Sequence, residues 1–144
     1  MFKLLDETYK NLSTYTPITD EQILHYKEKY FGFIDKDYII CITDKDDKLI
    51  SFAITMPSYS RALQKANGSL LPFGWYHLLN AGRKNERANF YLIGIHPEYQ
   101  RRGVTAIIFK EIWKTSKKKG VKFLETNPEL EENKNIQLLW QDYN

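Results

Sequence analysis

One stretch of the chain combines residue types and spacing that suit the binding of an anion. The apolar run at residues 91–95 ends shortly before Pro97, and the basic loop at residues 100–103 leads directly into a helical pattern. Loop N–H groups and the first unpaired N–H groups of a helix point in one direction, and the helix dipole adds partial positive charge. The two loop arginines add full charges, and Gly103 allows a close backbone approach or a positive φ. The stretch therefore predicts a phosphate or pyrophosphate site.

This stretch resembles motif A of the GNAT superfamily, the acetyl-CoA-dependent N-acyltransferases. In that motif a strand ending in Val/Ile-x-Pro is followed by Gln/Arg-x-x-Gly-x-Gly/Ala and a helix. The chain has Ile-His-Pro at residues 95–97 and Gln-Arg-Arg-Gly-Val-Thr at residues 100–105. Thr105 departs from the pattern, since Gly or Ala is usual there. Its side chain would crowd the first helical turn near the pyrophosphate, or its hydroxyl would donate a hydrogen bond to it.

The resemblance implies that acetyl-CoA is the co-substrate and that an amine accepts the acetyl group. It assigns the thioester carbonyl to the backbone N–H of Ile95, with Ile93 nearby, and the pyrophosphate to the backbone of residues 100–105. These backbone roles tolerate many side chains. The predicted cofactor-binding residues are Ile93, Ile95, Gln100, Arg101, Arg102, Gly103, Val104, Thr105 and Asn133.

The acid expected in the last helix is not at its usual place. Members of the superfamily commonly carry Asn-x-x-Ala-x-x-Leu-Tyr there, and the tyrosine acts as an acid toward the CoA sulfur. Aligned on Asn133, the chain has Trp140 at the tyrosine position, and an indole N–H does not ionise usefully. Tyr143, one helical turn further on, is the replacement candidate, its alternative role being a half-buried aromatic. Asn133 either contacts the cofactor or caps the helix.

Acyl transfer to an amine also needs a general base. The candidates are Glu125 in the strand after the motif, Glu98 in the loop and His96 beside it. Strand alternation places Glu125 on the face opposite its two neighbours, and a carboxylate near the end of such a strand is rarely needed for packing. We therefore predict Glu125 as the catalytic carboxylate. His96 has a suitable unperturbed pKa, but its place before Pro97 indicates a surface loop.

Hydrophobic periodicity and turn residues predict the elements that position these groups. Helices are expected at residues 2–12, 19–30, 58–66, 73–81, 104–119 and 128–143, with Gly82 just past the end of the fourth. Strands are expected at residues 37–43, 49–56, 89–95 and 121–126, the first two as an antiparallel hairpin. This order predicts a mixed α/β (α+β) sheet with a parallel pair at its centre. The resemblance implies that the central strands splay apart around CoA.

Composition sets the class of protein. A length of 144 residues with 42% hydrophobic residues and a net charge of +3 predicts one globular domain, residues 1–144. The single Cys41 excludes an internal disulfide and is expected in the core. Three scattered histidines and one cysteine lack metal-ligand spacing, so no metal site is predicted. No run is long enough to span a bilayer and no signal pattern is present, so a cytoplasmic protein without a membrane partner is expected.

Two further groups of residues have alternative interpretations. The lysines at residues 117–119 are expected to form a solvated helix end. The aromatic residues Tyr59, Phe73, Trp75 and Tyr76 either wall the acceptor pocket or fill the core beside the sheet, and we favour the core.

The GNAT core continues past its last helix with two more strands, whereas this chain ends at Asn144. Either the final hairpin is missing, or another chain supplies it through association, or the chain is part of a longer polypeptide. We favour a fragment, because the chain is similar to GNAT-like C-terminal portions of longer bacterial proteins.

Three functions follow from these observations. The first is an acyl-CoA-binding domain that transfers an acetyl group to an amine. The second is a catalytically degenerate GNAT-fold binding or structural module, favoured by Trp140, Thr105 and the missing strands. The third, with the least support, is nucleic-acid binding through the basic loop and the lysine run.

Overall fold

The computed structural model describes residues 1–12, 15–31, 34–69, 71–128, 131 and 133–140. The helices are α1 (Phe2–Tyr9), α2 (Asp20–Tyr26), α3 (Ser60–Lys65), α4 (Gly74–Arg83), α5 (Val104–Lys119) and α6 (Lys134–Trp140). The strands are β1 (Ile39–Thr43), β2 (Leu49–Pro57), β3 (Arg87–Ile95) and β4 (Phe123–Thr126). Short helical turns are η1 (Lys27–Phe31, π), η2 (Lys36–Tyr38, 3-10) and η3 (Pro97–Tyr99, 3-10).

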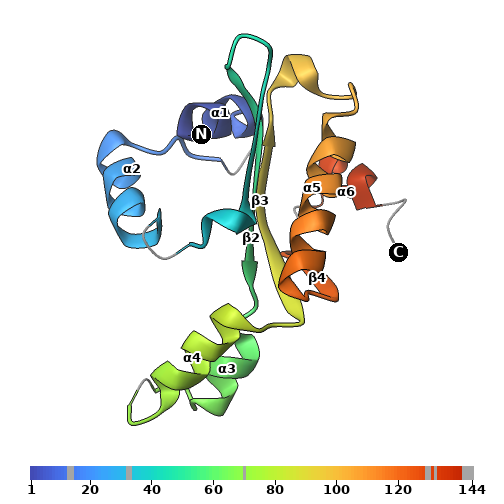
Figure 1. Cartoon of the computed structure of the whole chain (residues 1–144). Helices are drawn as coiled ribbons and strands as arrows, with labels where there is room; N and C mark the ends of the chain where they lie inside the picture. Colours follow the sequence, from blue (N-terminus) through green and yellow to red (C-terminus); the bar gives the residue numbers. More distant parts are fainter. Residues whose placement is uncertain (13–14, 32–33, 70, 129–130, 132, 141–144) are drawn as a thin grey trace.

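The four strands form one mixed sheet in the order β1-β2-β3-β4. The two pairs β1–β2 and β2–β3 are antiparallel, and β3–β4 is parallel. Helices α1 and α2 lie on one side of the sheet, and α5 and α6 lie on the other (Figure 1). The predicted mixed α/β class is confirmed, but in the described part of the chain the parallel pair lies at an edge of the sheet, not at its centre.

Strand β4 is short and pairs with β3 over its whole length. The pairing of β3 with β4 ends where Phe90 lies opposite Thr126, whereas β3 continues to Ile95. A bulge interrupts the pairing of β2 with β3 at the same level, because Ile54 pairs with Leu92 and the next residue of β2 pairs with Phe90. Among the described residues, the second half of β3 therefore has no neighbouring strand on the side of β4. This open edge is where the resemblance implies that the central strands splay apart.

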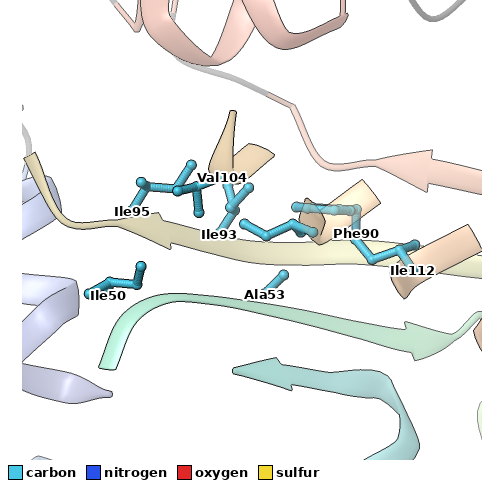
Figure 2. Close-up of a cluster of buried hydrophobic side chains, with 8 residues drawn as sticks. Ile50, Ala53, Phe90, Ile93, Ile95, Val104 and Ile112 are labelled. Carbon is cyan, nitrogen blue, oxygen red and sulfur yellow. The ribbon is translucent and has the colours of Figure 1, made fainter. Parts of the chain in front are cut away.

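A hydrophobic core lies between the sheet and α5. Val104, Ile108 and Ile112 are spaced four residues apart, so they form one buried stripe on α5. They pack against residues of β2 and β3, and Figure 2 shows these side chains meeting between strands and helix. The members of this cluster are Ile50, Ala53, Phe90, Ile93, Ile95, Val104, Ile108 and Ile112.

A second cluster packs α1 on the other face of the sheet. Leu4 and Leu5 of α1 cover Phe52 and Ile54 of β2. Phe52 is fully buried, and its ring lies so close to Gly94 that a Cβ there would be 2.5 Å from Phe52 Cε1. Gly94 therefore allows the close approach of ring and strand.

Several element boundaries differ from those predicted. The predicted strand start at residue 121 is wrong, because the N–H of Val121 donates to Ser116 O and closes the C-terminus of α5 behind Gly120. Helix α1 ends before residue 12, and α6 begins only after Asn133. Helix α4 continues through Gly82, where a Cβ would meet the Tyr59 hydroxyl at 3.3 Å. The capping box that starts α2 at Thr19 is confirmed.

Two predictions about buried residues are wrong. Cys41 is exposed, because β1 is an edge strand whose residues Ile40 and Ile42 face the α5 core. Cys41 thus points to the opposite face. The aromatics Phe73 and Trp75 do not fill the core beside the sheet. They are 70% and 49% exposed, on a helical hairpin that projects from the sheet (Figure 1).

Candidate functional site

The loop between β3 and α5 has the backbone geometry of an anion site. It begins with the turn η3, whose N-terminus is capped by His96, as Nδ1 accepts a hydrogen bond from the N–H of Glu98 at 3.3 Å. Arg101 and Gly103 then adopt left-handed conformations with φ of 60° and 78°. Consecutive N–H groups in such a loop form an anion-binding concavity. Gly103 is the N-cap of the sixteen-residue helix α5.

The N–H groups of this loop are available to a ligand. Among the described residues, none accepts a hydrogen bond from the backbone N–H of residues 101–105. The first intrahelical bond of α5 runs from Ala106 N to Gly103 O at 3.1 Å. A Cβ on Gly103 would meet nothing within 4 Å, so the space in front of the loop is open. The positive end of the helix dipole and the side chain of Arg101 border this space.

The end of β3 presents its backbone to the same region. The carbonyl of Ile93 accepts a hydrogen bond from the Tyr9 hydroxyl at 2.7 Å, and the carbonyl of Ile95 accepts one from Gln100 Nε2 at 3.3 Å. Both contacts lie on the side of β3 that faces away from β2, beyond the end of β4. In a strand the N–H and C=O of one residue point to the same side. The N–H groups of Ile93 and Ile95 therefore face this open edge.

Two adjoining hollows connect the loop with the open edge of β3. The first, about 360 Å³, is called here the anion groove and is lined by Glu7, Tyr9, Ile95, Gln100, Arg101 and Thr105, among others. The second, about 340 Å³, is called the splay pocket and lies between residues 90–93 of β3 and residues 126–128 after β4. The hollows share the side chains of Tyr9, Leu12, Ile93, Asn133 and Ile136. Together they form an elongated path from the anion loop to the gap between the strands.

Tyr9 stands where the two hollows meet. Its hydroxyl reaches the edge of β3 from α1, and burial raises the pKa of the Tyr9 phenol above its ordinary value. The ring of Tyr15 lies 6.0 Å from that of Tyr9, and its hydroxyl donates to the Asp6 carboxylate. Burial and this hydrogen bond raise the pKa of Tyr15 to about 12. The sequence analysis missed Tyr9, because it lies 84 residues from Ile93 and no local pattern links them.

Glu7 also lines the anion groove from α1. Its Oε2 lies 3.4 Å from Nε2 of His96. Since Nδ1 of this histidine accepts from the N–H of Glu98, the hydrogen-bond pattern places the imidazole proton on Nε2, facing Glu7. His96 lies in the expected loop, but its side chain is only 14% exposed. Glu7 and His96 form a dyad at the mouth of the groove.

The predicted cofactor-binding residues have different positions in the structure. Gln100, Arg101 and Thr105 line the anion groove. Val104 is buried in the core, so only its backbone faces the loop, and the Arg102 guanidinium lies 5.8 Å from the centre of the Tyr99 ring.

The predicted residues of the last helix have separate places. Asn133 lines both hollows and caps α6, accepting from Ile136 N at 3.4 Å. Trp140 is partly buried, packs on the core and lines the splay pocket, with edge-on ring contacts to Phe90 and Phe109 at 5.5 and 5.3 Å. Tyr143 lies outside the described residues.

The structure does not bring Glu125 to this path. Its carboxylate forms an ion pair with Arg87 across β3 and β4, and it lines neither the anion groove nor the splay pocket. The Arg87 guanidinium also lies 4.8 Å from the centre of the Phe123 ring. Glu98, the other loop candidate, is 75% exposed, and its carboxylate lies 3.9 Å from His96 Nδ1.

The lysine run at the end of α5 is engaged by the protein itself. Lys119 forms ion pairs with Asp35 and Asp37 at 2.7 and 2.9 Å, and Lys118 approaches Asp37 at 3.6 Å. Lys117 lies 5.2 Å from the centre of the Trp113 ring. These contacts tie the helix end to η2, which argues against a free basic surface for nucleic acid. In the part of the chain that the structure describes, no group of side chains has the composition of a metal site, and no helix is long and apolar enough to cross a bilayer.

Comparison with known sequences does not identify a family for this chain. No protein-family model matches the chain. A curated relative, Protein YghO of Escherichia coli (strain K12), is 28% identical over 88 residues, which cover 60% of this chain and 22% of that protein. The chain thus spans about a fifth of the length of this relative.

Comparison with solved structures is more informative. A protein described as a phosphinothricin N-acetyltransferase superposes with a TM-score of 0.66 at 14% identity, covering 99% of this chain and 72% of the other. The diaminobutyrate acetyltransferase of Paenibacillus lautus, solved with its substrate and coenzyme A, gives 0.57 at 14% identity over 99% and 68%. A ribosomal-protein-alanine N-acetyltransferase from Brucella melitensis gives 0.54 at 12% identity over 94% and 77%. The mixed sheet and its helices thus have the fold of the GNAT acetyltransferases.

Proposed function

We propose that the chain binds acetyl-CoA and transfers its acetyl group to an amine. One observation carries this proposal: a continuous path of two hollows leads from an open anion loop to the gap between β3 and β4. A CoA thioester has the matching order of groups, with a pyrophosphate at one end and a reactive carbonyl at the other.

The residues present fit such a ligand. The pyrophosphate would lie against the unpaired N–H groups of residues 101–105, near Arg101 and the side chain of Thr105. The N–H groups of Ile93 and Ile95 would donate to the pantetheine and to the thioester oxygen, where negative charge develops in the transition state. Thr105 lines the groove without closing it, so this departure from the family pattern is compatible with binding.

Tyr9 fits the role of the missing acid. In the proposed step the amine nitrogen attacks the thioester carbon, the C–S bond breaks, and the Tyr9 hydroxyl gives its proton to the thiolate sulfur. Burial raises the pKa of this phenol, so the proton is in place at neutral pH. The hydroxyl lies at the edge of β3 beside Ile93, as the step requires. Tyr143 remains the alternative donor.

Glu7 and Glu125 compete for the role of the base that takes the amine proton. Glu7 lines the anion groove and lies beside His96, whereas Glu125 forms an ion pair with Arg87 and lines neither hollow. Of the two carboxylates, only Glu7 lines the path, and it does so on the anion-groove side of Tyr9. The matched substitutions Glu7→Gln and Glu125→Gln separate the two: the first is expected to lower turnover and the second to leave it unchanged. The reverse result would restore Glu125.

The test is calorimetric titration of the chain with acetyl-CoA at moderate salt, followed by a screen of amines for thiol release. Micromolar binding with turnover supports the proposal. Binding without turnover for any amine supports the rival, a GNAT-fold module that holds a CoA ligand without catalysis. The core position of Trp140 favours this rival, since no acid stands at the usual place. No binding would refute both.

A further inference from the structure

The α3–α4 hairpin, residues 58–84, is not used by the proposed site. It joins the end of β2 to the start of β3, whereas the anion loop follows the end of β3. The hairpin therefore projects from the end of the sheet opposite the loop between β3 and α5, as Figure 1 shows. Its two helices pack on each other, and its turn is the most distant part from the sheet.

This hairpin exposes an unusual concentration of large apolar side chains. Thirteen such side chains are recorded as exposed among the described residues, and six of them lie between residues 63 and 79. Leu71 and Phe73, next to the turn, are 78% and 70% exposed. Single exposed apolar residues are normal, but a cluster of this kind marks an interaction surface. The six are Leu63, Leu71, Phe73, Trp75, Tyr76 and Leu79.

Several polar groups of the turn are hydrogen-bonded within the hairpin. The N–H groups of residues 67, 68 and 69 donate to the carbonyls of Gln64, Leu63 and Ala66. The Ser69 hydroxyl donates to Leu71 O at 2.9 Å, and the Trp75 indole donates to Pro72 O at 3.0 Å. Polar groups without a hydrogen-bond partner make insertion into lipid unfavourable. The internal hydrogen bonds therefore lower the free-energy cost of moving this turn out of water.

The charge of the hairpin selects the partner. Residues 58–84 contain four basic and no acidic residues, whereas the rest of the chain contains seventeen basic and eighteen acidic residues. All of the net positive charge of the chain is therefore located in this hairpin. Two copies meeting through their hairpins would bring like charges together, which disfavours self-association by this surface. An anionic surface complements both the charge and the apolar turn.

We propose that the α3–α4 hairpin docks on a membrane surface that carries anionic lipids. Leu71 and Phe73 enter the boundary between headgroups and acyl chains, where Trp75 and Tyr76 have the amphipathic rings typical of that depth. Arg61 and Lys65 of α3 supply positive charge that attracts the lipid phosphates. No spanning segment is needed, so the expectation of no membrane partner, which rested on spanning runs, does not exclude this docking. The proposal does not depend on acetyl transfer.

Vesicle flotation tests the proposal on the full chain. Binding is expected to vesicles of phosphatidylcholine with about a third phosphatidylglycerol, to weaken with salt, and to be absent for pure phosphatidylcholine. Leu71→Ser with Phe73→Ser should abolish binding, whereas Trp113→Ser, an equally exposed site on α5, should leave it unchanged. Arg61→Ala and Lys65→Ala should each weaken binding about fivefold. Lys114→Ala on α5, whose side chain is 75% exposed, is the matched charge control.

A second measurement reports insertion directly. Vesicles with bromine-labelled acyl chains should quench the tryptophan fluorescence of the wild type, and Trp75→Phe should remove most of this quenching. Equal binding to neutral and anionic vesicles, no binding to either, or equal losses for hairpin and control variants would overturn the proposal. So would a dimer in sedimentation velocity without vesicles that the Leu71→Ser, Phe73→Ser variant converts to monomer, because the hairpin would then be a protein interface.

Discussion

Gly103 and Gly120 offer a matched test of the anion site, because they cap the two ends of the same helix. Gly103 precedes α5 with φ of 78°, and Gly120 follows it with φ of 74°. A Cβ added at either position would meet no atom within 4 Å. In both cases alanine costs only the strain of a left-handed conformation, about 1 to 2 kcal/mol. Gly103→Ala and Gly120→Ala should therefore lower the free energy of unfolding by similar amounts.

The two variants should differ in CoA affinity. At Gly103 the new methyl group enters the space assigned to the pyrophosphate, whereas at Gly120 it is at the far end of α5. Gly103→Glu also brings a negative charge within about 5 Å of the ligand, which costs about 3 kcal/mol per unit charge at an effective dielectric of about 20. This corresponds to a loss of more than about a hundredfold in affinity. Calorimetric titration with acetyl-CoA, with thermal unfolding of each variant, measures both effects.

The outcome discriminates between two explanations. If Gly103→Ala and Gly120→Ala weaken binding equally, the loss comes from helix stability and not from contact with the ligand. If Gly103→Glu binds as tightly as the wild type, the loop does not hold the pyrophosphate and the reasoning from its N–H groups is refuted.

Two further predictions concern stability. Gly94→Ala should destabilise the fold by about 1 to 3 kcal/mol, because its Cβ would lie 2.5 Å from the buried ring of Phe52. Chemical denaturation measures this, and Phe52→Leu in the same chain should recover part of the loss. Lys119→Met should lower the melting temperature between about pH 4 and pH 10, and this difference should shrink as the pH falls below the ordinary aspartate pKa of about 3.9. The Lys119 ion pairs hold the pKa values of Asp35 and Asp37 below their ordinary range, so the stabilisation is present above about pH 4 and lost as the pH falls through the folded-state pKa values. An equal difference in melting temperature at pH 2 would contradict this assignment.

The anion loop could be predicted from sequence because its signals are local. A proline, a basic pair and Gly103 follow one strand within a few residues, and each has a direct backbone consequence. The order of strands and helices was predictable for the same reason. The hydrophobic periodicity of a short segment indicates whether it forms a helix or a strand.

The side chains of the path could not be predicted, because they come together through tertiary packing. Tyr9 and Glu7 reach the end of β3 only because Leu4 and Leu5 seat α1 on Phe52. Alternation placed Glu125 on the expected face, but its partner Arg87 depends on the register of β3 with β4.

Burial was mispredicted for a related reason. Hydrophobic character does not say which face of a strand a helix covers, or whether a helical hairpin packs on the sheet at all. For these reasons the sequence did not predict that Cys41 is exposed, or that the hairpin residues Phe73, Trp75 and Tyr76 are exposed.

Tyr9→Phe tests whether the phenol has a chemical role beyond its structural one. Loss of the hydrogen bond to Ile93 O should cost about 1 kcal/mol of folding free energy, since the ring and its packing are kept. As a proton donor, Tyr9 should also be worth about a hundredfold in kcat, with little change in CoA affinity. Because burial raises the pKa of the phenol, the wild-type rate should fall only at strongly alkaline pH, and the variant should lack this limb.

Tyr15→Phe is the matched control, because its ring is adjacent and its hydroxyl is bonded to Asp6 and not to the edge of β3. It should lose stability without losing the alkaline limb. If Tyr9→Phe turns over at the wild-type rate, the acid lies elsewhere and Tyr143 becomes the candidate to test. If both variants lose turnover rate in the same proportion to their loss of stability, Tyr9 has only a structural role. A loss of kcat confined to Tyr9→Phe, with CoA affinity kept, would show that α1 supplies the proton that the last helix, with Trp140 in its core contacts, does not.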